Sequence, residues 1–245
     1  MQRQAARLTA CCKNGNPCQS GSSAKDLPTR IAEVALKEMK PDFRLYLITD
    51  RKLFGSADEL LQTIDKALAG GVRAVQLREK DLDTRPLLAL AHTMRKMTKR
   101  YGAKLFINDR ADIALAVGAD GVQLGRAGMP VPAVRKLSGG NLMIGVSTHS
   151  IAEALQAKAD GADFITLGPV YATPSKLRYG NPIGIQVLRD AAGSLGLPVF
   201  AIGGIRIDRV TDVLRRGAYG IALISAVLTA TDVRKTAEAF MRELS

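Results

Sequence analysis

The sequence predicts an α/β protein, a single (β/α)8 barrel of the TIM type preceded by an N-terminal extension. Three observations lead to this fold. Short apolar runs alternate with longer segments whose apolar residues recur at helical spacing. The apolar runs are continuous, which is typical of strands buried on both faces of a parallel sheet. Eight strand and helix units in about 200 residues fit a closed barrel better than an open doubly wound sheet.

The predicted strands follow one another from the first apolar run onward. They are residues 44–49, 74–77, 104–108, 121–124, 143–146, 164–167, 198–202 and 220–224. Helical patterns fill the intervals, for example at residues 60–71 and 85–102, and often end in glycine. The alternative is an open Rossmann-like sheet, but no GxGxxG motif follows the first strand.

Residues 1–41 are expected to form an extension, partly disordered or helical, and residues 42–245 the catalytic barrel. Within the extension, residues 31–40 have helical spacing and Pro41 stops the pattern. Residues 1–25 contain basic but no acidic residues, so a transit peptide is weighed against a disordered tail or a start codon placed too early. The cysteines at 11, 12 and 18 are interpreted as reduced thiols rather than a metal or redox site.

The composition and net charge of the chain limit the classes of partner that we expect. No stretch approaches the roughly 20 apolar residues of a membrane span, so we expect a cytoplasmic protein without a membrane partner. The net charge of +12 raises nucleic acid as a partner, but aromatic residues are only 4% and no nucleic-acid-binding motif is present. We therefore expect no nucleic-acid partner, and part of the positive charge serving a highly phosphorylated small molecule. A homo-oligomer is left open.

Active sites of such barrels form where the strands end and the following loops begin. Polar residues occupy nearly every one of these positions. In strand order they are Thr49, Asp50 and Arg51; Gln76, Arg78, Glu79 and Lys80; Asn108, Asp109 and Arg110; Gln123; Ser147 and His149; Thr173, Ser175 and Lys176; Gly203 and Gly204; Ser225 and Ala226. The sixth loop, Leu167 to Gly184, is much longer than the roughly 2–6 residues usual in α/β domains, which indicates a functional loop.

The last two loops have the features of a phosphate site. Gly203 and Gly204 let backbone N–H groups approach an anion closely, and Ser225 and Ala226 open a helix whose N-terminus favours one.

Three cations, Arg78, Lys80 and Lys176, come from two other loops and are candidates to surround a second polyanion, such as a leaving pyrophosphate. Asp109 is a candidate Mg²⁺ ligand, because Mg²⁺ usually binds one or two carboxylates plus phosphate oxygens. The amides of Gln76 and Asn108 suit a heteroaromatic ring, although either amide can equally satisfy polar groups of the barrel. For His149, a loop hydrogen bond and a chemical role stay open.

Seven motifs closely resemble those of thiamine-phosphate synthase, in the same order and at comparable spacing. They are VQLREK (75–80), INDR (107–110), ADGVQLG (119–125), GVSTHS (145–150), GPVYATPSK (168–176), AIGGI (201–205) and ALISA (222–226). The resemblance spans about residues 43–245 and implies a transferase of thiamine biosynthesis. Such an enzyme joins 4-amino-2-methyl-5-hydroxymethylpyrimidine pyrophosphate to a thiazole phosphate and releases pyrophosphate.

The resemblance also implies roles for individual residues. Arg78, Lys80 and Lys176, with Mg²⁺ on Asp109, would neutralise the departing pyrophosphate. Gln76 and Asn108 would contact the pyrimidine, and Ser147, Thr173 and Ser175 would contact substrate. The thiazole phosphate would be bound by Gly203, Gly204, Ser225 and Ala226.

Two departures from the family pattern matter. Synthases typically read LGQxD after the fourth strand, and the Asp is a second Mg²⁺ ligand; here the segment is LGRAG, with Arg126 and Gly128. The metal site is therefore predicted to be one carboxylate short. The sixth loop reads TPSK where TxTK is usual, and Ser175 preserves the hydroxyl.

The same superfamily contains a thiazole tautomerase, which isomerises the thiazole phosphate precursor. Tautomerases tend to lose the acidic residue of INDR and the QxREK pattern, and both are present here, which favours the synthase. His149 matches the base proposed for tautomerases, but synthases often carry it too. A basic nucleic-acid-binding module is a distant third hypothesis.

Overall fold

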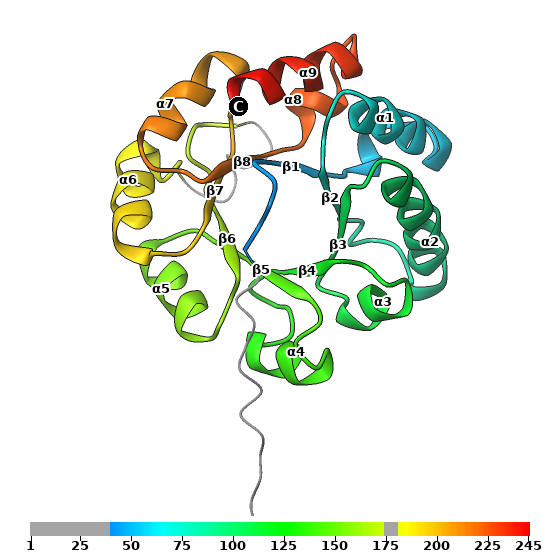
Figure 1. Cartoon of the computed structure of the whole chain (residues 1–245), viewed down its shortest axis with the longest axis horizontal. Coiled ribbons are helices and arrows are strands. Elements are labelled where there is room, and N and C mark those ends of the chain that lie inside the picture. Colours follow the sequence, from blue (N-terminus) through cyan, green and yellow to red (C-terminus); the bar gives the residue numbers. More distant parts are fainter. Residues whose placement is uncertain (1–39, 174–180) are drawn as a thin grey trace, which may run out of the picture. The chain divides into compact units, whose positions relative to one another are not determined.

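The computed structural model describes residues 40–173 and 181–245. Eight parallel strands form a closed ring in sequence order, and β8 pairs with β1 to close it (Figure 1). The strands are β1 (Leu45–Ile48), β2 (Ala74–Leu77), β3 (Lys104–Asn108), β4 (Gly121–Leu124), β5 (Met143–Thr148), β6 (Phe164–Leu167), β7 (Val199–Ile202) and β8 (Gly220–Leu223). The predicted barrel is confirmed, and the open-sheet alternative is wrong.

Helices surround the ring (Figure 1). The α-helices of the described residues are α1 (Ala57–Ala69), α2 (Thr84–Arg100), α3 (Ala111–Ala116), α4 (Val131–Leu137), α5 (Ile151–Ala159), α6 (Gly184–Leu195), α7 (Val210–Arg215), α8 (Ser225–Leu228) and α9 (Val233–Glu243). Short 3-10 helices are η1 (Arg51–Leu53) and η3 (Ile207–Arg209). Helix α1 begins before the predicted residue 60 because the Ser56 side chain caps it by accepting the N–H of Glu59. The helical pattern was predicted at residues 31–40, and its first nine residues lie outside the described residues, as do the three cysteines.

Strand β5 is longer than predicted. It continues to Thr148 because Ser147 and Thr148 pair with Thr166 and Leu167 of β6. Ser147 therefore lies within the strand rather than after it, and its side chain follows the inward direction of Met143.

Aromatic rings fill the first half of the barrel interior. Phe43, Tyr46, Phe106, Phe164 and Phe200 are buried against one another, with neighbouring ring centroids 5.2–6.1 Å apart. Small residues on other strands make room for these rings. The interior is thereby closed toward the amino ends of the strands, which leaves space only toward their carboxyl ends.

Two aspartates fix where even-numbered strands begin. Asp120, just before β4, accepts the N–H of Leu105 at 2.8 Å and pairs with Arg95 of α2. Asp163, just before β6, accepts the N–H of Ile144 at 2.6 Å and pairs with Arg135 of α4 at 2.8 Å. Each carboxylate thus ties a strand to the preceding strand and to a covering helix.

None of the helices in residues 40–173 and 181–245 is both long and apolar enough to cross a lipid bilayer.

The close packing around Gly121 in the barrel interior leads to a prediction about the stability of the fold. A Cβ added at Gly121 would lie 2.4 Å from both the Phe106 ring and the Met143 carbonyl oxygen, whereas one added at Gly193 in α6 would meet nothing within 4 Å. We expect Gly121→Ala to lower the free energy of unfolding by about 1–3 kcal/mol through overpacking. The matched control Gly193→Ala should raise it by about 0.5 kcal/mol. Urea unfolding followed by circular dichroism measures both, and equal effects of the two substitutions would contradict this packing.

Candidate functional site

The carboxylate of Asp109 gathers residues from three strands. Its Oδ2 accepts a hydrogen bond from Asn108 Nδ2 at 2.7 Å and lies 3.4 Å from Lys80 Nζ. Its Oδ1 accepts the backbone N–H of Gly125, after β4, at 2.6 Å. These four residues, called the Asp109 cluster below, bring together three loops that are distant in sequence.

The backbone of Asp109 adopts an uncommon conformation. Its φ of 58° lies in the left-handed region, the only such value for a non-glycine residue in the described part of the chain. Its N–H donates to the Gln123 carbonyl at 2.9 Å, so the β3–β4 ladder holds the residue in place. Asp tolerates this region better than most residues, and such strain often accompanies functional sites.

Gly128 lies directly beside this carboxylate. A Cβ at Gly128 would be 2.7 Å from Asp109 Oδ1 and 3.1 Å from the Gly125 carbonyl oxygen. The position that holds a carboxylate in the family pattern is therefore adjacent to Asp109, as the motif implies. Nowhere in residues 40–173 and 181–245 do three or more His, Cys, Asp or Glu side chains group in a way that could hold a metal ion.

A hollow of about 230 Å³ opens between the loops after β2 and β3. Since a water molecule occupies about 30 Å³ in the liquid, the hollow has room for several. It is lined by Leu77, Glu79, Lys80, Leu82, Leu87, Asn108, Asp109 and Arg110. Charged and amide groups thus face one concave space at the carboxyl ends of the strands.

The barrel interior above the aromatic rings has two different sides. Strands β2 to β6 direct five polar side chains inward, which we call the polar arc: Gln76, Asn108, Gln123, Ser147 and Thr166. The remaining strands contribute Ile48, Ile202 and Ile224. A planar heteroaromatic ring with polar atoms on one edge matches such a divided interior.

Hydrogen bonds link members of the polar arc. Gln76 Nε2 donates to the Tyr46 hydroxyl at 3.3 Å, and Gln123 Nε2 donates to Ser147 Oγ at 3.1 Å. Burial raises the pKa of Tyr46, so its hydroxyl stays neutral. The Gln123 Oε1 atom is buried and has no hydrogen-bond partner among the described residues. Gln123 was expected at the end of its strand but was given no role, and Thr166 was not among the predicted site residues; alternation along β4 and β6 indicates the inward direction of both.

His149 has a defined tautomer. Its Nδ1 lies 2.6 Å from the carbonyl oxygen of Gly168, at the start of the loop after β6. A carbonyl can only accept, so Nδ1 carries the proton and Nε2 of the neutral ring is an acceptor. The backbone N–H of His149 donates to Glu153 at 2.7 Å. The ring therefore contacts the loop and retains a basic nitrogen.

Gly203 and Gly204 are required by the neighbouring loop. Their φ values are 99° and 64°, and added Cβ atoms would lie 2.5 Å from Pro169 and 2.7 Å from the Ala172 carbonyl oxygen. The loop is also held by Tyr171, whose N–H donates to the Gly203 carbonyl at 3.1 Å. Close packing of the β6 loop thus explains both glycines, and their contact with a phosphate stays a prediction.

The other predicted residues are placed as follows. Ser225 and Ala226 open α8, as expected, and the first N–H groups of a helix have no partner within it. Arg78 follows β2, and Thr173 lies at the edge of the described chain. Ser175 and Lys176 lie outside the described residues.

Glu79 makes a buried connection that the sequence pattern did not predict. Its side chain is 5% exposed and accepts hydrogen bonds from the Thr49 hydroxyl at 2.5 Å and from the Arg51 N–H at 3.0 Å. Burial raises the pKa of Glu79, and the two hydrogen bonds oppose this effect. The only hint in the sequence was that Glu79 lies between the cationic residues Arg78 and Lys80 at the end of a strand.

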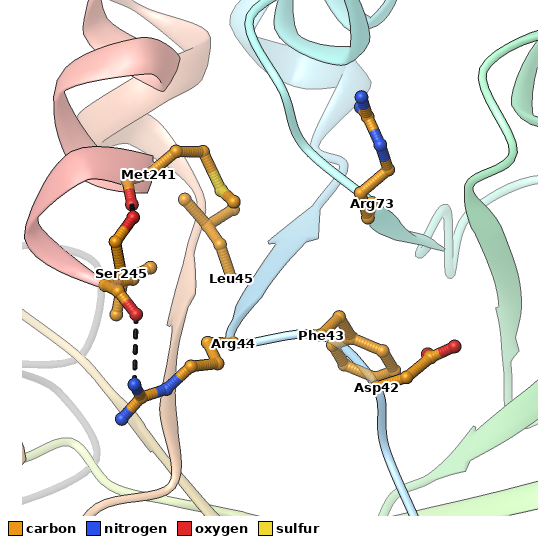
Figure 2. A pocket seen from close by; sticks show the side chains of 8 residues that line it. Asp42, Phe43, Arg44, Leu45, Arg73, Met241 and Ser245 are labelled. Atoms are coloured by element: carbon orange, nitrogen blue, oxygen red, sulfur yellow. Dashed lines mark hydrogen bonds between the residues drawn. The ribbon is translucent and has the colours of Figure 1, made fainter.

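A second hollow, of about 170 Å³, lies at the beginning of β1 (Figure 2). The side chains of its two arginines donate hydrogen bonds to backbone carbonyl oxygens. Arg44 donates to those of Leu244 at 3.0 Å and Tyr219 at 3.1 Å, and Arg73 donates to that of Val72 at 3.0 Å. Asp42, which pairs with Lys104 at 3.4 Å, is the one side-chain carboxylate among the eight residues that line this hollow, and none of the eight carries a side-chain amide.

The fold and the site define a class, a (β/α)8-barrel enzyme whose site at the carboxyl ends of the strands combines cations, amides and a carboxylate. Residues 45–227 match the family described as thiamine monophosphate synthase. The thiamine-phosphate synthase of Chloroflexus aurantiacus is 45% identical over 196 residues, which cover 80% of this chain and 90% of that protein. The solved thiamine phosphate pyrophosphorylase of Pyrococcus furiosus superposes with a TM-score of 0.75 at 42% identity, covering 82% and 95% of the two chains.

The chain belongs to the thiamine-phosphate synthase family, and the resemblance found in its motifs is confirmed. A 3-hexulose-6-phosphate synthase also superposes, with a TM-score of 0.63 at 19% identity, and this likeness shows the fold alone.

The raised pKa of Glu79 gives a pH prediction. The ordinary pKa of Glu is about 4.3. Because the folded protein holds this proton more tightly than the unfolded chain, Glu79 contributes stability at acidic pH that is lost as pH rises through its folded pKa. We expect the unfolding free energy of the wild type minus that of Glu79→Gln to fall as pH rises from about 4 toward 7. Urea unfolding at several pH values tests this; a constant or rising difference would disprove it.

Proposed function

We propose that this enzyme transfers the hydroxymethylpyrimidine group from its pyrophosphate to a thiazole phosphate, giving thiamine phosphate and pyrophosphate. The observation that carries the proposal is the Asp109 cluster in a member of this family. Lys80 of the QxREK pattern lies 3.4 Å from the acidic residue of INDR, so the two motifs that suit a pyrophosphate meet in space.

The chemistry requires a leaving group to be stabilised. The bond between the methylene carbon and the pyrophosphate oxygen breaks, and its electron pair leaves with pyrophosphate. The pyrimidine ring stabilises the methylene cation, and the thiazole nitrogen supplies the electron pair of the new C–N bond. The barrier falls when positive groups already in place neutralise charge that develops on the departing oxygen.

Three cations are proposed to perform this neutralisation: Arg78, Lys80 and Lys176. Lys80 is supported by its place in the Asp109 cluster and on the wall of the hollow. Arg78 is supported by its position two residues before Lys80 in the same loop. Lys176 rests on the motif alone.

The pyrimidine is proposed to lie against the polar arc. Gln76, Asn108 and Ser147 present amide and hydroxyl groups from β2, β3 and β5, and the isoleucines opposite suit the face of a ring. The thiazole phosphate is proposed to lie toward the ends of β7 and β8. There Gly203, Gly204, Ser225 and Ala226 would hold its phosphate through backbone N–H groups. Thr173 and Ser175 are proposed, from the motif, to contact substrate.

Mg²⁺ fits this donor set as an ion completed by substrate. Asp109 is one carboxylate, and Mg²⁺ is commonly bound through one or two carboxylates plus substrate phosphate oxygens. When bound, the ion would neutralise charge on the pyrophosphate. Asn108 and the Gly125 N–H would hold Asp109 in orientation, and Lys80 would supply a further positive charge.

A thiazole tautomerase is the second candidate. The observation that favours it is His149, whose hydrogen bond to the Gly168 carbonyl leaves Nε2 as a base.

The proposed reaction is tested by supplying both substrates with and without Mg²⁺. We expect pyrophosphate release that depends on the thiazole phosphate and on Mg²⁺, together with thiamine phosphate in equal amount, measured by mass spectrometry. Isomerisation of the thiazole precursor without pyrophosphate release would instead identify a tautomerase.

Because Gly128 stands where the family pattern has Asp, the effect of restoring this carboxylate can be predicted. We expect Gly128→Asp to lower the Mg²⁺ concentration for half-maximal activity roughly tenfold, because a metal-site partner commonly changes affinity by this much. Because the new Cβ would lie 2.7 Å from Asp109 Oδ1, the Asp109 side chain must shift to admit it. Gly128→Asn is the control, since it adds the same bulk without the charge. If both variants behave alike, the carboxylate account of this position is wrong.

A further inference from the structure

Glu79 and Thr49 join the ends of β1 and β2 through one chain of hydrogen bonds. The Arg78 N–H donates to Thr49 Oγ1 at 2.9 Å, and the same hydroxyl donates to Glu79 Oε1 at 2.5 Å. On the other side, the Arg51 N–H donates to both oxygens of Glu79, at 3.2 and 3.0 Å. Thr49 is fully buried, so water does not compete for these contacts.

These hydrogen bonds lie just beyond the end of strand β2. Strand β2 ends at Leu77, so the β ladder does not fix the backbone of the following residues. The Thr49 hydroxyl uses its proton for Glu79 and a lone pair for the Arg78 amide, so it orients the residue that follows the strand. Valine has the same shape as threonine but can do neither, whereas serine can do both.

The side chains of Glu79 and of its neighbour Lys80 extend toward different strands. Glu79 turns toward β1, while its neighbour Lys80 reaches Asp109 beyond β3 at 3.4 Å. Among residues 40–173 and 181–245, Glu79 forms no ion pair, so its buried charge depends mainly on N–H and O–H donors, with a smaller contribution from the charge of Arg51. A buried charge that loses such donors is costly, so the arrangement resists rearrangement.

We propose that Glu79, acting through Thr49, is a positioning residue that holds Arg78 and Lys80 toward the pyrophosphate of the substrate. This inference rests on the proposed synthase function and deepens it. The buried pair that follows β1 and β2 would thus fix the geometry of the pyrophosphate side of the site. The thiazole phosphate side, near β7 and β8, does not depend on it.

The test compares Thr49→Val with Thr49→Ser in the full-length enzyme. The Thr49→Val variant should raise the KM for the pyrimidine pyrophosphate and the Kd for inorganic pyrophosphate about tenfold, as expected for a lost hydrogen bond to a charged group. Its KM for the thiazole phosphate should keep the wild-type value, and Thr49→Ser should restore both altered constants. Glu79→Gln should shift the same two constants in the same direction.

Glu59→Gln is a matched control, because exposed Glu59 also accepts a backbone N–H, from Gly55 at 2.9 Å. It should leave every constant unchanged. A purely structural role would reduce the active fraction and leave both KM values in place, so unchanged constants in Thr49→Val overturn the inference. Equal shifts for both substrates overturn it too. A wild type that binds pyrophosphate but forms no product contradicts the proposed function, and the Kd values of the Thr49 variants for inorganic pyrophosphate still decide the inference.

Discussion

Closing eight parallel strands into one ring brings every strand's carboxyl end to the same rim of the barrel. The aromatic rings of Tyr46, Phe106, Phe164 and Phe200 occupy the other half of the interior, so polar side chains find room only at this rim. Residues as distant in sequence as Lys80 and Gly125 therefore meet at Asp109. The site is a consequence of strand closure combined with a filled floor.

Negative charge at the rim is arranged at two depths. Glu79 is buried and holds backbone and hydroxyl donors, whereas Asp109 is partly exposed beside Lys80 and the hollow. The buried carboxylate suits a fixed structural task, because its donors are fully committed. The more exposed one suits exchange of partners, because a cation or phosphate-bound metal can replace the contact with Lys80. The same residue type thus serves two purposes according to burial.

Strand positions were predictable from the sequence because parallel strands covered by helices are continuously apolar, as in residues 199–202 and 220–223. The end of β5 was not, since Ser147 and Thr148 are polar and their strand conformation comes from pairing with β6. Asp109 and Lys80 could be proposed from their loops, but their contact depends on side-chain reach across strands. Gly203 and Gly204 show a different difficulty: packing against Pro169 and Ala172 requires glycine there, whatever ligand binds. The pairing of Thr49 with Glu79 gave no local pattern, because hydrogen bonds between loops leave no periodic trace.

The proposed function depends on one binding site for pyrophosphate, at the rim between β2 and β3 beside Lys80. Its most direct test is calorimetric binding of inorganic pyrophosphate, with Mg²⁺, to Lys80→Ala and to Lys96→Ala, an exposed lysine of α2 that serves as the control. Loss of a charge-assisted contact should weaken binding to Lys80→Ala about tenfold or more. Binding to Lys96→Ala should match the wild type. Unchanged affinity in Lys80→Ala would contradict the account.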